Sequence, residues 1–151
     1  MLKETLIEFF ERDLLKLKEE VSLYRKEEDL WLVKGEISNS AGNLCLHLIG
    51  NLKHFIGAVL GNSGYIRERE SEFTFNNIPR AQLLNEIENT KTIVIDTLNK
   101  MNNDEFEKLF PVEKHGKQVT TENMLIHLFG HFNYHLGQIN YHRRLVMLFP
   151  S

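Results

Sequence analysis

The sequence has little of several features that define whole classes of proteins. Its 151 residues include one cysteine and three prolines. A single cysteine cannot form a disulfide within the chain, which favours a reducing, cytoplasmic setting. No stretch approaches the roughly 18 apolar residues of a membrane span, and the charged start at residues 1–4 is unlike a signal peptide. We therefore expect a cytoplasmic protein that does not enter a membrane.

An excess of positive charge is also missing. The chain has 18 lysines and arginines against 21 aspartates and glutamates, which gives a net charge of −3. The two signs are interspersed, so nothing favours binding to nucleic acid or to an anionic membrane. The length suits one domain, and we expect residues 1–151 to form it. A small-molecule partner fits this composition better than a polyanion.

Helical periodicity is what the sequence has in abundance. Apolar residues recur at steps of three and four in four segments, while no stretch alternates as a strand would. Ser40 and Thr120 are suited to cap the second and fourth segments, and Pro79 and Pro150 to bound the third and fourth. The pattern predicts an all-α fold, an antiparallel four-helix bundle with long crossover connections. The predicted helices cover residues 5–25, 41–61, about 79–101 and 121–148.

Seven histidines are unusual for this length, and most fall on two of the predicted helices. At about 100° per residue, one arc of about 80° on the last helix holds four of them and a glutamine. His131 and His135 are four residues apart, so both rings can reach one metal ion. The arc borders the apolar face of the helix. Its members are His127, His131, His135, Gln138 and His142.

The second predicted helix carries a similar polar arc, with His47, Asn51 and His54 within about 60° of one another. His47 is the best third ligand, and three neutral imidazoles suit Zn²⁺ or Ni²⁺ while leaving a position open. A metal-free alternative stays open, in which the histidines hydrogen-bond to one another and to nearby amides. We expect His115 and His142 to be incidental. Candidates to support the ligands are Gln138, Asn51, His54 and His127.

Other features favour structural interpretations. Cys45 lies among aliphatic residues and is expected to be an inert core thiol. Glycine within a helix costs about 1 kcal/mol, so the helical glycines suggest close backbone packing, within the bundle or across a dimer. The charged residues 67–70 are interpreted as a solvated, salt-bridged loop that could border a pocket, and Tyr134 as a packing residue. The helical glycines in question are Gly50, Gly57, Gly130 and Gly137.

Residues 125–139 resemble the last-helix motif of the DinB/YfiT-like family, H-x-x-x-H-[R]-G-Q. His131, His135, Gly137 and Gln138 match it, whereas Leu136 stands where many members have arginine. Residues 46–57 and 64–73 also resemble a branch of this family. The resemblance implies a four-helix bundle, often dimeric, with a divalent metal held by His47, His131 and His135.

Family members of known activity are thiol transferases that use low-molecular-weight thiols, or thiol-dependent isomerases. The resemblance implies a metal-dependent thiol transferase or hydrolase acting on a small electrophilic substrate, with a thiol cosubstrate supplied from outside the chain. An open metal position can activate a thiol or a water molecule. The alternative is a non-catalytic, metal-stabilised bundle that binds a ligand or a partner. We expect a homodimer in either case.

Overall fold

The computed structural model describes residues 1–148, and these residues are helical with no β-strand. Two short 3₁₀ helices, η1 and η3, lie in the connections, and a π-helix, η2, continues α2 without a break. The all-α prediction is confirmed. The elements are α1 (Leu2–Leu23), η1 (Glu27–Trp31), α2 (Ala41–Leu52), η2 (Lys53–Leu60), α3 (Arg69–Thr74), α4 (Arg80–Lys100), η3 (Asn103–Phe106) and α5 (Thr121–Leu148).

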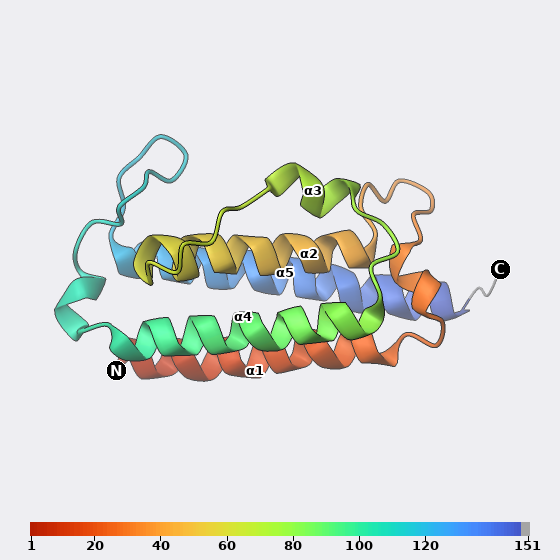
Figure 1. Ribbon diagram of the computed structural model, residues 1–151, viewed down its shortest axis with the longest axis horizontal. Coiled ribbons are helices and arrows are strands. Elements are labelled where there is room, and N and C mark those ends of the chain that lie inside the picture. The colour runs from red at the N-terminus through yellow and green to blue at the C-terminus, as the bar shows by residue number, and fades with distance from the viewer. Residues whose placement is uncertain (149–151) are drawn as a thin grey trace.

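Four long helices lie side by side, and short α3 lies over α2 (Figure 1). The chain runs from left to right in α1 and α5, and from right to left in α2 and α4. α1 therefore packs antiparallel against α4, and α2 antiparallel against α5. The connection between α2 and α4 returns along the length of α2 and includes α3. This return places residues 65–75 beside the second predicted helix.

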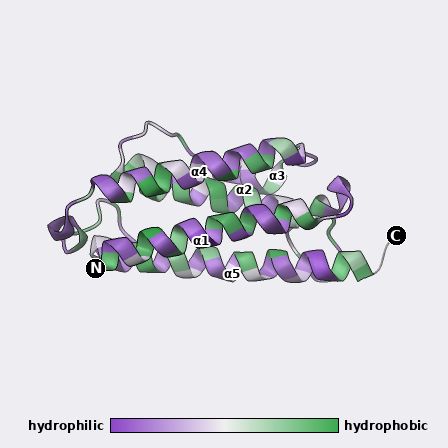
Figure 2. Ribbon diagram, turned by 90° about the horizontal axis from the view of Figure 1, so that it is seen from below, coloured by the Kyte–Doolittle hydropathy of each residue, from purple (hydrophilic) through white to green (hydrophobic). Residues whose placement is uncertain are grey.

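The long helices each carry apolar and polar bands along their surfaces (Figure 2). Their apolar bands meet in a core that runs the length of the molecule. No helix within residues 1–148 is long and apolar enough to cross a membrane. Fully buried side chains come from α1, α2, α4 and α5 alike and include Phe10, Leu17, Leu48, Leu98 and Phe132.

The predicted helix starts agree with the structure. Ser40 caps α2, because its Oγ accepts a hydrogen bond from the Asn43 amide at 3.1 Å. Thr120 accepts one from the Asn123 amide at the start of α5, and Pro79 immediately precedes α4. The predicted stop at Pro150 lies outside the described residues.

The structure differs from the prediction in the second helix and in the connection that follows it. The helix predicted over residues 41–61 is α-helical only to Leu52 and continues as a π-helix to Leu60. The period of apolar residues cannot distinguish these two forms over so few turns. The second difference is α3, a six-residue helix within a segment interpreted as a solvated loop. Its placement matters for the candidate site.

Polar side chains fix the register of α5 against α1. Asn133 donates to the carboxylate of Asp13 at 3.0 Å, and Asn140 donates to Glu20 at 2.7 Å. Arg143 completes the second contact with a 2.6 Å ion pair to Glu20. Both carboxylates are buried, and losing such a partner is costly, so sliding α5 along α1 is disfavoured.

His142 was expected to be incidental, and that expectation is wrong. Its side chain is buried, its Nε2–H donates to the Leu32 carbonyl at 2.8 Å, and its Nδ1 accepts from the Tyr24 hydroxyl at 2.6 Å. The ring thus ties α5 to the end of α1 and to the segment after η1. A helical wheel cannot show this contact because both partners lie more than 100 residues away in sequence.

We expect His142→Phe to lower the free energy of unfolding by about 1–3 kcal/mol, because two buried hydrogen bonds are lost. Burial lowers the pKa of His142, so the unfolded chain binds a proton first as pH falls below about 6.5. Wild-type stability should therefore decline below that pH, and the decline should be smaller in His142→Phe. Urea unfolding at pH 7 and pH 5 measures both effects.

The matched control is His115→Asn, in the exposed turn where His115 has a positive φ of 49° that asparagine tolerates. This surface change should alter stability by less than about 0.5 kcal/mol. Equal stabilities of the two variants would contradict the structural role of His142.

Candidate metal centre

Three histidines converge between α2 and α5. One ring nitrogen from each of His47, His131 and His135 lies within 4.8 Å of the other two. The Nε2 atoms of His47 and His131 are 3.1 Å apart. His131 and His135 reach this point together because residues four apart share a helical face, and His47 meets them from the neighbouring antiparallel helix. The structure brings together the three ligands predicted from the sequence.

In His47 and His135, neighbouring side chains determine which ring nitrogen is available to bind a metal. Glu72 accepts a hydrogen bond from His47 Nδ1 at 3.0 Å, and Gln138 accepts one from His135 Nδ1 at 2.7 Å. A carboxylate and an amide oxygen only accept, so these two contacts require a proton on each Nδ1. The Arg67 guanidinium, 3.3 Å from His47 Nδ1, then donates to Glu72 and not to the ring. Each Nε2 therefore keeps its lone pair for a metal. Such outer contacts are typical of histidine metal sites.

Glu72 is itself held by a second charged group. Arg67 donates to both of its carboxylate oxygens at 2.8 Å, and the two side chains are only 10% and 7% exposed. Burial opposes ionisation of Glu72, but the hydrogen bonds from Arg67 and His47 outweigh it and lower the pKa of the carboxyl. The carboxylate thus stays charged while it orients His47.

This arrangement corrects the interpretation of residues 67–70 as a solvated loop. Glu68, Arg69 and Glu70 are exposed, as expected, but Arg67 turns inward and α3 brings Glu72 with it. Glu72 and Arg67 are the supporting residues that sequence reasoning missed. The one signal for them was the presence of both in a segment that resembles the family.

Gly50 explains why Glu72 can lie so close to α2. A Cβ atom at Gly50 would stand 1.9 Å from Glu72 Oε2, closer than any van der Waals contact permits. Gly57 faces side chains of Ile93 and Ser63, whereas a Cβ added at Gly130 or Gly137 would meet no atom within 4 Å among the described residues. The helical glycines therefore do not bring two backbones together within the chain, and that part of the prediction is wrong.

The environment of α5 favours the neutral form of two of the three rings, those of His131 and His135. Burial, and then the neighbouring His135 and His47, lower the pKa of His131 to about 4. Burial also lowers the pKa of His135, although the hydrogen bond to Gln138 partly opposes this shift. Neutral imidazole is the form that binds metals. Three imidazole rings that direct nitrogens to one point fit a divalent ion.

The remaining candidates lie outside this cluster. Asn51 is buried one turn beyond His47, and its Oδ1 has no hydrogen-bond partner within residues 1–148. His54 stacks edge-on against Phe55, and His127 against His115. None of the three forms a described hydrogen bond to a ligand histidine. Of the supporting residues predicted, Gln138 is the one with a hydrogen bond to a ligand histidine among the described residues.

A cavity of about 560 Å³ opens beside the ligand His135. It lies between α5 and the segment that precedes α2, and His135 and Gln138 form part of its wall. Tyr134 also lines it; its ring packs edge-on against His135, and the side chain is 65% exposed. The cavity gives a small molecule access to one side of the histidine cluster.

A comparison with protein families matches residues 5–147 of this chain to one described as "Protein of unknown function (DUF1572)". The chain belongs to the DUF1572 family. This family is grouped in the DinB/YfiT-like clan, which agrees with the resemblance seen in the sequence motifs. No curated protein matches the chain.

Cys45 of this DUF1572 chain takes no part in the site. Its side chain is fully buried in the core, and burial raises the pKa of the thiol to about 12. A thiol in that state is a poor ligand and a poor nucleophile. The expectation of an inert core cysteine is confirmed, and any thiol chemistry of this DUF1572 protein would need a thiol from outside the chain.

We expect Gly50→Ala to displace the Glu72 carboxylate and to free His47 from its orienting partner. Loss of such a contact typically lowers metal affinity about 10–100-fold. Zinc affinity is measured by competition with a chromogenic chelator. The matched control is Gly130→Ala on α5, where nothing lies within 4 Å of the added Cβ among the described residues. Equal zinc affinities in the two variants would show that Glu72 does not support the site.

Proposed function

We propose that His47, His131 and His135 hold a divalent metal, zinc or nickel, and that the site is catalytic. The reaction proposed is the transfer of a low-molecular-weight thiol, or of water, to a small electrophilic substrate. The observation that carries this proposal is the convergence of three ring nitrogens within 4.8 Å, beside an open cavity. We also propose that the four long helices form the antiparallel bundle of the DinB/YfiT-like clan.

A divalent ion at this point would supply Lewis acidity, which favours the deprotonated form of a thiol or water beside it. The chain's own residues prepare the site for that ion. Glu72 and Gln138 hold His47 and His135 with the Nε2 atoms free. Burial keeps the pKa of His131 low. His131 and His135 therefore need no deprotonation to bind the metal near pH 7.

The cavity beside His135 supports a particular class of substrate. Tyr134, Tyr141 and Leu145 give it an aromatic and aliphatic wall, and Glu36 is the one charged residue, histidines aside, that lines it among the described residues. Without a lysine or arginine, this wall does not favour an anionic group. We propose a neutral electrophile with an apolar or aromatic body, on which the thiol sulfur forms the new bond and a leaving group departs.

The alternative is a metal that only stabilises the helices, in a protein that binds a ligand or partner. Structural zinc sites are closed by four protein ligands. The cluster within residues 1–148 has three, with no fourth histidine, cysteine or carboxylate among its members. An incomplete ligand set beside a cavity favours the catalytic proposal over this alternative.

The first experiment measures metal in the protein purified without a histidine tag. We expect elemental mass spectrometry to find about one zinc or nickel ion per folded chain, because three histidine ligands hold one ion. His131→Ala should lose the metal. His127→Ala, one helical turn away on α5 and outside the cluster, should keep it. Absence of metal from folded wild-type protein, or its retention in His131→Ala, would contradict the proposed site.

The second experiment tests catalysis with the metal-loaded protein. A panel of low-molecular-weight thiols is mixed with a neutral aromatic electrophile, and thiol consumption is followed. We expect turnover in wild type and in His127→Ala, and a loss of about a hundredfold or more in His47→Ala, because metal catalysis contributes several kcal/mol. If wild type turns over no faster than His47→Ala, with thiols or with water as nucleophile, the structural alternative is favoured.

We also propose that the protein is a homodimer. One face of α5 remains apolar and exposed, and its two glycines would allow a second helix to approach closely. Exposed apolar side chains in a continuous row are typical of contact surfaces. The row comprises Ile126, Gly130, Tyr134, Gly137, Tyr141, Leu145 and Leu148. Because Tyr134, Tyr141 and Leu145 also line the cavity beside His135, the partner chain would form part of the border of that cavity.

Sedimentation of wild-type protein should give twice the chain mass, and Gly130→Arg should shift it to the monomer. The arginine would occupy space that is open in one chain but needed by a partner helix. Glu11→Arg, on an exposed position of α1, serves as the control and should remain dimeric. A monomeric wild-type protein would contradict this proposal.

A further inference from the structure

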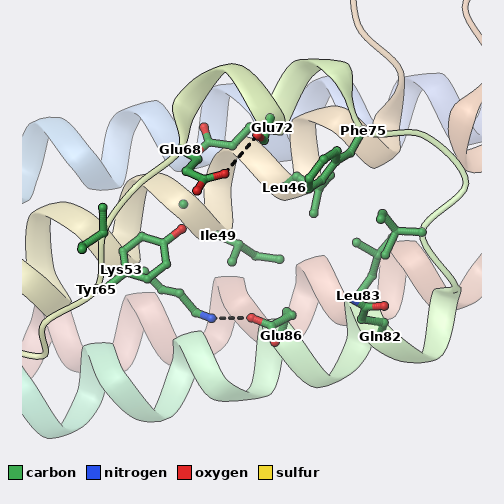
Figure 3. A pocket seen from close by; sticks show the side chains of 14 residues that line it. Leu46, Ile49, Lys53, Tyr65, Glu68, Glu72, Phe75, Gln82, Leu83 and Glu86 are labelled. Carbon is green, nitrogen blue, oxygen red and sulfur yellow. Dashed lines mark hydrogen bonds and ion pairs between the residues drawn. The ribbon is translucent and has the colours of Figure 1, made fainter.

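A second cavity, of about 280 Å³, lies between α2, α3 and α4 (Figure 3). None of the three ligand histidines lines it, whereas Glu72 does. It is therefore a different space from the cavity beside His135. The first cavity reaches the histidine cluster through His135 itself, and the second through Glu72, which contacts His47. Its volume is near the lower end for small-molecule sites, about 300 Å³.

Most of the wall is apolar and comes from three elements. Leu46 and Ile49 extend from α2, Phe75 follows α3, and Leu83 extends from α4 (Figure 3). Phe75 is 51% exposed, which is unusual for a side chain of this size next to a core. The cavity thus offers an open apolar surface that the chain itself leaves partly uncovered.

The charged groups of the wall leave a negative excess. Lys53 forms an ion pair with Glu86, and Glu72 is paired with Arg67. Glu68 has no ion-pair partner within residues 1–148, and its carboxylate accepts only a 3.4 Å hydrogen bond from Ser71. In Figure 3, Glu68 lies on the α3 side of the cavity and the Lys53–Glu86 pair on the α4 side, with Ile49 between them. An anionic ligand would meet uncompensated negative charge here.

We propose that this cavity binds a small organic cation, a primary amine with an apolar body. The ammonium group would lie beside the carboxylate of Glu68, and the apolar body would contact Phe75 and Leu83. Opposite charge at the rim and apolar area on the floor together select this class over carboxylates and over polar cations. The site does not depend on a metal.

The test is an NMR titration of the full chain with hexylamine at pH 7, compared with hexanol and hexanoate. We expect amide shifts at Ile49, Ser71 and Gln82, with hexanoate binding at least about tenfold more weakly than hexylamine because its charge is opposed. Hexyltrimethylammonium, which cannot coordinate a metal, should shift the same amides. Shifts confined to α5 near His135 would instead show binding at the metal centre and overturn the proposal.

Two variants test the location. Ser71→Trp should fill the cavity and abolish the shifts, whereas Thr74→Trp, exposed on the same helix outside the cavity, should leave them unchanged. Glu68→Gln removes the unpaired charge of an exposed residue and should weaken hexylamine about two- to fivefold, without affecting hexanol. Equal binding of the amine, alcohol and acid, or equal effects of the two tryptophans, would overturn the proposal.

Discussion

The buried carboxylate of Glu72 connects the parts of this protein that the candidate site requires. It accepts hydrogen bonds from Arg67 and from His47, and it occupies the space that the missing side chain of Gly50 leaves open. Burying a carboxylate without such partners is strongly unfavourable. The three contacts therefore fix where α3 lies on α2, and they fix the orientation of one ligand ring.

The position of the other two ligands depends on α5 as a whole. A helix advances about 100° per residue, so a shift of one residue in register would turn His131 and His135 away from His47. The contacts of Asn133 and Asn140 to buried carboxylates on α1 oppose such a shift. The polar contacts between α1 and α5 thus serve the site on the opposite face of α5.

The two cavities lie on either side of this framework and differ in chemistry. The one beside His135 has an aromatic wall and reaches a ligand histidine. The one beside α4 has an apolar floor and negatively charged residues at its rim, and none of the three histidines lines it. Glu72 lines the second cavity and orients His47, so a ligand bound there would lie one side chain away from the histidine cluster.

Helix periodicity, capping residues and histidine spacing in the sequence predicted the helical segments and the three histidines that the structure brings together. These features are local, because residues three and four apart share a helical face whatever surrounds them. The roles of Arg67, Glu72, His142 and Gly50 were decided only by the tertiary structure. Each depends on a partner from another element, and a charged or polar residue looks the same in sequence whether water or a buried group completes its hydrogen bonds.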